Sequence, residues 1–174
     1  MRKPLIRNER PADRAAIRAL TQAAFAGHPH SQQTEHFIVD ALRQAHALTV
    51  SLVAEVEGAV VGHVAFSPVV IGDGSPGWYG VGPLSVLPAR QGRGIGRELM
   101  HQGLQRLRML GAAGCVLVGE PAYYGHFGFG RDAGLWLADV PAEYFLALTL
   151  AGPAAHGEVR FHPAFAADES PPRG

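Results

Sequence analysis

The chain contains a single cysteine, Cys115, among its 174 residues. It cannot close an internal disulfide, and it stands in the apolar run 115–118 with nothing cationic nearby in sequence. We therefore interpret it as a buried strand residue in a reducing cytoplasm rather than as a nucleophile. No apolar run approaches the roughly 20 residues of a membrane helix. The start, Met1-Arg2-Lys3-Pro4, lacks the apolar core of a signal peptide, so we expect a cytoplasmic protein without membrane contact.

An excess of charge of either sign is also missing. Fifteen Lys and Arg residues balance fifteen Asp and Glu residues, and apolar residues make up 47% of the chain. A net charge of zero supplies no long-range attraction for nucleic acid or an anionic membrane. We therefore expect an ordinary globular protein with a single domain over residues 1–174, in which 170–174 form a disordered tail.

Changes in the apolar period predict an α/β fold with a mixed sheet. The clearest helix covers 94–110, where Ile95, Leu99, Leu104, Leu107 and Leu110 form one apolar stripe. Gly82-Pro83 interrupts the strand expected at 78–87, and a proline cannot donate to a ladder, so this strand is expected to be bulged or unpaired there. The strands expected are 5–7, 49–55, 59–70, 78–87, 115–119, 145–150 and 158–165, and the helices are 11–24, 34–45, 94–110 and 121–128.

The turn Arg90-Gln91-Gly92-Arg93-Gly94-Ile95-Gly96 is the most informative segment. It joins a strand to the clearest helix, and its three glycines in five positions leave the backbone N–H groups unshielded. The start of the following helix adds the positive end of its dipole, and Arg90 and Arg93 add positive charge. This combination predicts a phosphorylated cofactor.

Three nucleotide-binding or structural interpretations compete for this turn. A P-loop requires Gly-Lys-Ser or Gly-Lys-Thr, and neither occurs in the chain. A Rossmann turn requires Gly-x-Gly-x-x-Gly, whereas residues 92–96 read Gly-x-Gly-x-Gly. Glu120 nevertheless lies near the acidic position that such a fold places about 20 residues downstream, which keeps a nucleotide-dependent oxidoreductase open. The glycines also suit a tight strand-to-helix turn that binds nothing.

Two further segments carry a family resemblance. The pattern Gln91-x-x-Gly94-x-Gly96, after Pro83-Leu84-Ser85-Val86-Leu87-Pro88, resembles the coenzyme A signature of the GCN5-related N-acetyltransferases (GNAT). The run Glu120-Pro121-Ala122-Tyr123-Tyr124-Gly125-His126-Phe127-Gly128-Phe129 is similar to the closing motif of that superfamily, at matching spacing. The order of the expected elements also fits from Leu5 onward, so the resemblance covers nearly the whole chain.

The resemblance implies the GNAT acyl-CoA N-acyltransferase fold. This fold has a mixed, mostly antiparallel sheet of about six or seven strands with splayed central strands, flanked by about four helices. It also implies acetyl-CoA as the cosubstrate, with its pyrophosphate on the amides of the turn and its pantetheine arm paired to strand 84–86 like an added strand. The implied cofactor-binding residues are Leu84, Ser85, Val86, Gln91, Gly92, Arg93, Gly94, Ile95, Gly96, Arg97 and Tyr124.

The same resemblance assigns the chemistry of amine acetylation. The carbonyl oxygen needs a hydrogen-bond donor as it becomes anionic, and the backbone N–H of Leu84 is expected to supply it. The leaving thiolate needs a proton, which we assign to Tyr124 because it occupies the tyrosine position of the motif and its phenol is protonated at neutral pH. Its neighbour Tyr123 is expected to pack the short helix against the sheet.

The general base is less well determined by the sequence. Glu120 stands where related sequences often carry aspartate, and it either orients water near the thioester or favours the helix dipole. His63 lies in a valine-rich strand and is interpreted as a core histidine. Glu55 is another candidate, and a water chain without a single base is also open.

Other functional classes have less support. The histidines His28, His30 and His36 lie close in sequence, but they lack a carboxylate pattern and are interpreted as a polar loop near the substrate mouth, so no metal is expected. A serine hydrolase elbow, Gly-x-Ser-x-Gly, is missing. A non-catalytic acyl-CoA-binding module is the main competitor of an enzyme. The acceptor is expected to be a small-molecule amine or a protein amine, and a homodimer through the C-terminal strands is left open.

Overall fold

The main sheet carries most of the chain. The computed structural model describes residues 3–169, so the tail expected at 170–174 lies outside the described residues. Within them, six strands pair in the order β1-β2-β3-β5-β6-β8, and only β5 and β6 are parallel. The expected mixed, mostly antiparallel sheet is therefore confirmed. The strands are β1 (Leu5–Asn8), β2 (Val50–Val56), β3 (Ala59–Pro68), β5 (Trp78–Val86), β6 (Gly114–Val118) and β8 (Phe145–Thr149).

The sheet opens between β5 and β6. These strands pair only at Trp78–Gly114, Tyr79–Cys115 and Gly80–Val116, although β5 continues as far as Val86. The register of β5 against β3 shifts across Gly82-Pro83, which confirms the predicted bulge. Because pairing with β6 stops just before this bulge, the second half of β5 has one side without a strand partner in the described chain.

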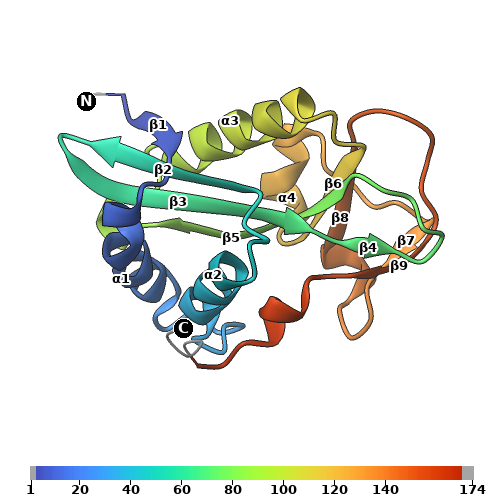
Figure 1. The fold of residues 1–174 in the computed structure, drawn as a ribbon, viewed down its shortest axis with the longest axis horizontal. Coiled ribbons are helices and arrows are strands. Elements are labelled where there is room, and N and C mark those ends of the chain that lie inside the picture. Colours follow the sequence, from blue (N-terminus) through green and yellow to red (C-terminus); the bar gives the residue numbers. More distant parts are fainter. Residues whose placement is uncertain (1–2, 170–174) are drawn as a thin grey trace.

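Helices cover both faces of the sheet (Figure 1). On one face lie α1 (Arg14–Phe25), which follows a 3-10 turn at Pro11–Asp13, and α2 (Glu35–Gln44). On the other face lies α3 (Ile95–Met109), and the short α4 (Pro121–Tyr124) runs into the 3-10 turn Gly125–Phe127 after β6. The four α-helices among the described residues match the number expected.

Helix α3 lies unusually close to the sheet. A Cβ built on Gly103 would stand 2.4 Å from ring atoms of Phe66, which is fully buried in β3. The helix buries Ile95, Leu99, Leu104 and Leu107 as predicted, and also Met100. The prediction for Leu110 is wrong, because α3 ends at Met109 and Leu110 is 58% exposed.

A second, small sheet was not predicted. The strand expected at 59–70 divides, because β3 ends at Pro68, which lacks a backbone N–H, and the chain resumes as β4 (Val70–Ile71). The strand expected at 158–165 is shorter, β9 (Gly157–Arg160), and a 3-10 turn at Pro163–Ala166 follows it. These strands and β7 (Leu135–Trp136) pair in the order β4-β9-β7. Their core joins the main sheet through Trp78, Val116 and Phe145.

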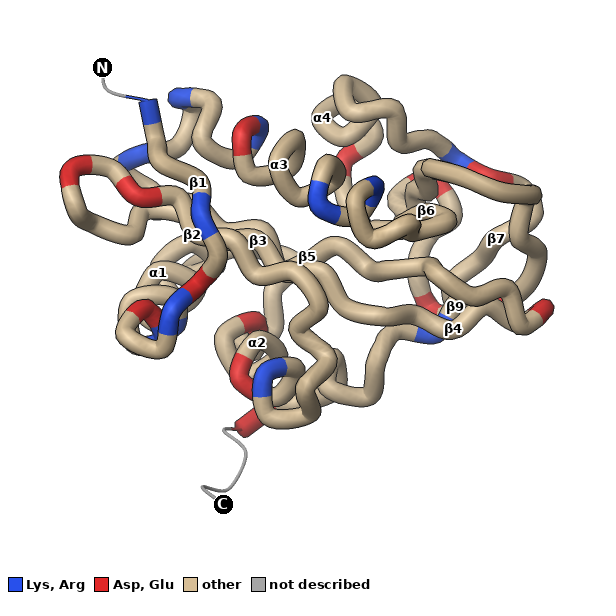
Figure 2. The backbone as a smooth tube through the Cα atoms, turned by 45° about the horizontal axis from the view of Figure 1, so that its top comes forward, with Lys and Arg blue, Asp and Glu red and all other residues tan. Residues whose placement is uncertain are grey.

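Charged residues are interspersed by sign along the backbone (Figure 2). The ion pairs Arg7–Asp13, Arg18–Asp40 and Arg43–Glu9 link segments that are separated in sequence. Among residues 3–169, no helix combines the length and apolar character needed to cross a membrane.

Candidate active site

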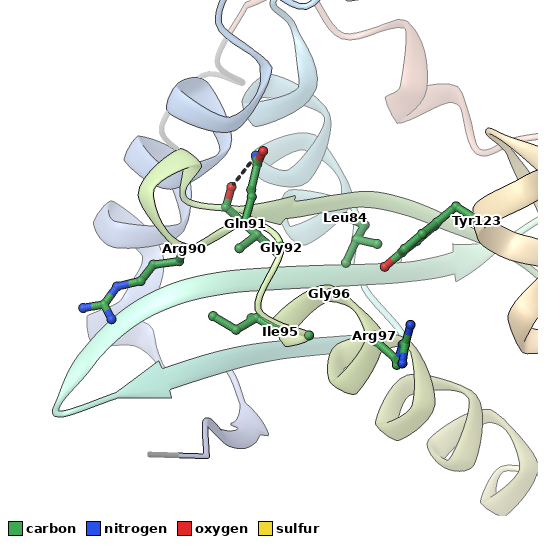
Figure 3. Close-up of a pocket in the computed structure, with 10 residues that line it drawn as sticks. Leu84, Arg90, Gln91, Gly92, Ile95, Gly96, Arg97 and Tyr123 are labelled. Atoms are coloured by element: carbon green, nitrogen blue, oxygen red, sulfur yellow. Dashed lines mark hydrogen bonds between the residues drawn. The ribbon is translucent and has the colours of Figure 1, made fainter. Parts of the chain in front are cut away.

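A pocket of about 360 Å³ lies where β5 separates from β6. Its wall comes from the second half of β5, the glycine turn, the first turn of α3 and one tyrosine of α4 (Figure 3). The residues that line it are Leu84, Val86, Arg90, Gln91, Gly92, Gly94, Ile95, Gly96, Arg97 and Tyr123.

The backbone of the turn requires glycine at two positions. Gly92 has φ +77° and Gly94, the N-cap of α3, has φ +83°, a left-handed conformation that disfavours residues with a Cβ. The turn is tied to the strand by Gln91, whose Nε2 donates to the Val86 carbonyl at 3.1 Å. The first N–H groups of α3 have no partner within the helix, so the turn presents donors and a positive dipole end to the pocket.

Most residues predicted to bind the cofactor lie together in this wall, and three do not. Successive side chains of a strand point to opposite faces, and Leu84 and Val86 line the pocket, so Ser85 points to the other face of the sheet. Its side chain there is 1% exposed. Arg93 and Tyr124 are also outside the lining set, whereas Arg90 is part of it.

The two adjacent tyrosines occupy different surroundings. Tyr123, which the sequence assigned to packing, lines the pocket, and its hydroxyl would lie 3.1 Å from a Cβ at Gly96. Tyr124 lies against Gly119 at the end of β6, where a Cβ would stand 2.3 Å from its ring. Burial raises the pKa of Tyr124 to about 12, so its phenol is protonated at neutral pH. Nothing in the spacing of the sequence motif predicted that Tyr123 lines the pocket instead of packing against the sheet.

The remaining candidate catalytic residues differ in how far they are buried. Leu84 is partly buried, lines the pocket and pairs with Val64 on β3. The Glu120 side chain is exposed and makes no cap hydrogen bond, while the Glu120 carbonyl accepts from the Tyr123 and Tyr124 amides at 3.1 Å. Glu55 is paired with Arg7 at 3.3 Å.

The three histidines between residues 28 and 36 do not point to a common site. His28 and His30 are exposed, with ring centroids 6.2 Å apart, whereas His36 is buried and lies 3.3 Å from the Gln22 amide. Across residues 3–169, no group of three or more His, Cys, Asp or Glu side chains is arranged to hold a metal ion.

Comparison with known proteins identifies the class. A model of the acetyltransferase (GNAT) family matches residues 14–129, and the chain belongs to that family. It is therefore an acyltransferase enzyme of the GNAT fold.

Individual relatives resemble the chain over most of its length. A GNAT family acetyltransferase from Brucella melitensis, solved with acetyl-CoA, is 52% identical with a TM-score of 0.83, covering 93% of this chain and 97% of that one. The Escherichia coli N-acetyltransferase YhbS, solved with CoA, is 34% identical with a TM-score of 0.86, covering 97% and 94%. In a sequence comparison, YhbS of Escherichia coli K12, an uncharacterized N-acetyltransferase, is 40% identical over 126 residues, 72% of each chain.

Proposed function

We propose that this protein transfers an acetyl group from acetyl-CoA to a primary amine by direct attack in a ternary complex, in the cytoplasm. The observation that carries the proposal is the glycine turn at the start of α3, which opens onto a pocket beside the unpaired side of β5. The bound acetyl-CoA and CoA of the two similar solved proteins support the choice of cosubstrate.

The residues present fit such a cosubstrate. Nothing lies within 4 Å of a Cβ at Gly92 or Gly94, so the backbone of the turn is open to close approach by a pyrophosphate. Arg90 and Arg97 line the same pocket and would balance phosphate charge. The unpaired side of β5 at 84–86 offers backbone groups to an extended pantetheine arm.

The chain's own groups then cover the needs of the transfer. Bound acetyl-CoA supplies an activated thioester. The backbone N–H of Leu84 would donate to its carbonyl oxygen as negative charge develops, and the Tyr124 hydroxyl would give a proton to the leaving thiolate. A phenol with a pKa of about 12 remains protonated at pH 7 and is available as that donor. We assign Glu120 to orienting water near the thioester.

The acceptor is proposed only as a class. A small-molecule amine or a protein amine would enter near the segment 25–36, where Phe25, His28 and His30 make edge contacts in the connection between α1 and α2. Homodimerisation through the C-terminal strands remains part of the same hypothesis.

A ligand-dependent melting experiment tests the proposal first. Acetyl-CoA at 100 times its Kd stabilises the folded protein by about 2.7 kcal/mol, which raises the Tm by several degrees at this size. We expect this shift with acetyl-CoA and not with NADH or ATP, followed by amine-dependent release of free thiol. A shift with NADH or ATP alone would reject the transferase. Acetyl-CoA binding without thiol release across a broad panel of amines would favour the non-catalytic module.

A further inference from the structure

A chain of buried and half-buried polar groups runs across the face of the sheet that α1 and α2 cover. His63 on β3 is fully buried, and its Nε2 lies 2.8 Å from the Ser51 hydroxyl on β2. The same hydroxyl is hydrogen-bonded to the Glu9 carboxylate, just after β1. Arg43 of α2 completes the group, with Nε and Nη2 at 3.0 and 3.1 Å from Glu9.

The positions of the protons follow from this geometry. Burial alone would raise the pKa of Glu9, but the bonds from Arg43 and Ser51 outweigh burial and hold the pKa below its usual range. The Glu9 carboxylate is therefore ionised and only accepts, so Ser51 donates to it. The Ser51 oxygen then accepts from Nε2–H of His63, which leaves a lone pair on Nδ1. Burial lowers the His63 pKa to about 4, so the ring is neutral at pH 7.

Two buried polar atoms on neighbouring strands have no hydrogen-bond partner in the described protein. Nδ1 of His63 and Oγ of Ser85 are both buried without a hydrogen-bond partner in the described protein. Their residues are direct partners on β3 and β5, and directly opposed Cβ atoms in a sheet lie about 5 Å apart. A single water between the two side chains would accept from Ser85 and donate to Nδ1, which would satisfy both groups.

The two ends of this chain of groups lie near different pockets. Ser85 belongs to the strand whose residues Leu84 and Val86 line the acetyl-CoA pocket, but its own side chain is on the opposite face of that strand, the face that α1 and α2 cover and from which the acceptor is proposed to enter. Glu9 and Ser51 line a second pocket of about 500 Å³, whose wall also includes the exposed Met109. These groups therefore link the strand that borders the acetyl-CoA pocket with a second pocket at the surface.

We propose that His63, Ser51 and Glu9 form a proton relay that deprotonates the acceptor amine, which rests on the proposed acetyltransferase function. The ammonium N–H bond breaks and its proton passes through the water at Ser85 to Nδ1 of His63. The Nε2 proton of His63 moves to Ser51, and the Ser51 proton forms an O–H bond on Glu9. Glu9, a weak base beside Arg43, releases that proton into the second pocket. One proton is displaced, and no electrons are transferred.

The charged groups around His63 favour a ring that stays neutral between proton transfers. Glu9 and Arg43 are the charged groups that act on the ring, and they are paired with each other. The other cluster on this face, Arg7 with Asp13 and Glu55, is separated from His63 by Val53 in the strand register. In the proposed relay a proton passes through the His63 ring, whereas burial disfavours a lasting positive charge on that ring.

Substitutions within the relay separate proton transfer from packing. Ser51→Ala interrupts the path, and Ser51→Thr restores a hydroxyl. His63→Gln keeps an N–H donor near Ser51 but offers no basic nitrogen. Ser67→Ala is the matched control, because Ser67 is a buried, unpaired serine of β3 on the same face that the relay does not use.

We expect Ser51→Ala and His63→Gln to lower kcat by about 100-fold, the scale of general base catalysis, with unchanged KM for acetyl-CoA. Ser51→Thr should recover most of the lost rate, and kcat of the wild type should fall in D2O. Full kcat in both relay variants, or an equal loss in Ser67→Ala, would overturn the relay while leaving the acetyltransferase intact. Absence of acetyl-CoA binding in the wild type would instead reject the proposed function.

A spectroscopic measurement tests the relay independently of turnover. In the folded wild type, ¹⁵N NMR of the histidine rings should show His63 as the neutral Nε2–H tautomer at pH 7. A resonance of the Nδ1–H tautomer, or of an imidazolium, would contradict the direction of the hydrogen bonds and overturn the relay. The Ser51→Ala variant should alter the Nε2 shift and leave the other rings unchanged.

Discussion

The adjacent tyrosines of α4 lie in different surroundings, because the short helix points them to different sides. Tyr123 lines the pocket and points toward Leu84 and Gly96 (Figure 3). The Tyr124 ring packs edge-on against Tyr123, with the two ring centroids 4.9 Å apart, and its centroid lies 6.3 Å from that of Phe129. The Tyr123 hydroxyl borders the pocket, whereas burial raises the pKa of Tyr124 to about 12, which suits the proton-donor role proposed for it.

Removing the two hydroxyls one at a time should therefore give different kinetics. Tyr124→Phe is expected to lower kcat by about 100-fold with little change in the Kd of acetyl-CoA, because only proton transfer is lost. Tyr123→Phe is expected to weaken acetyl-CoA binding with a smaller effect on kcat. Steady-state kinetics and calorimetric titration measure both. Equal kcat in wild type and Tyr124→Phe would remove Tyr124 from the mechanism.

Buried His63 should also make the fold sensitive to mild acid. Its pKa is about 4 in the folded protein and about 6.5 in the unfolded chain, so below pH 6.5 the unfolded state binds a proton that the folded state does not. Stability should fall by about 3 kcal/mol as the pH drops from 6.5 to 4. Urea unfolding at pH 7 and pH 4.5 should show a smaller loss for His63→Gln than for the wild type. An identical loss would contradict the neutral, buried ring.

At the scale of elements, the contact between α3 and the sheet depends on one glycine. Gly103 leaves room for the ring of Phe66, and both residues are buried. This approach fixes the height of α3 above β3 and hence the position of the helix start that borders the pocket.

Adding a methyl group at this contact should destabilise the protein. Gly103→Ala places its Cβ inside the space of the Phe66 ring, and overpacking of this kind costs about 1–3 kcal/mol, more than alanine gains from helix propensity. Gln105→Ala on the exposed side of α3 is the matched control. Thermal unfolding should show a lower Tm for Gly103→Ala than for the control. A raised Tm would mean that α3 moves freely away from β3.

The sequence predicted the elements whose patterns are long, and it missed those set by distant contacts. Helix α3 and the bulge at Gly82-Pro83 were predictable from apolar spacing and proline chemistry. The strands β4 and β7 have only two residues each, which is too few to show an apolar period, and they form by pairing with the distant β9. Likewise, the glycine turn could be predicted from its local sequence, whereas the position of Tyr123 in the pocket depends on how α4 packs against the rest of the protein.

The whole molecule joins two sheets through one shared core. Val159 of β9 is 1% exposed and packs in the cluster that includes Trp78 and Val116 of the main sheet. No residue of this cluster lines the pocket beside α3. A change in the cluster should therefore affect the stability of the fold without changing the pocket wall.

Weakening the second sheet should therefore lower the stability of the entire chain. Val159→Ala leaves a small cavity, which we expect to cost about 1–3 kcal/mol and to lower the Tm by several degrees. Calorimetry should show one transition, and the Kd of acetyl-CoA should remain that of the wild type. Two separate transitions would indicate that the small sheet unfolds independently.

The buried Cys115 has a practical consequence for a reaction that generates a thiol. Burial raises its pKa to about 12, so at pH 8 only about one molecule in ten thousand carries the thiolate that attacks disulfides. In the proposed transfer, free coenzyme A is the thiol that remains available to attack an added disulfide. An aromatic disulfide dye would then be reduced by the released coenzyme A and not by the folded enzyme, which gives turnover a colour signal without a protein background.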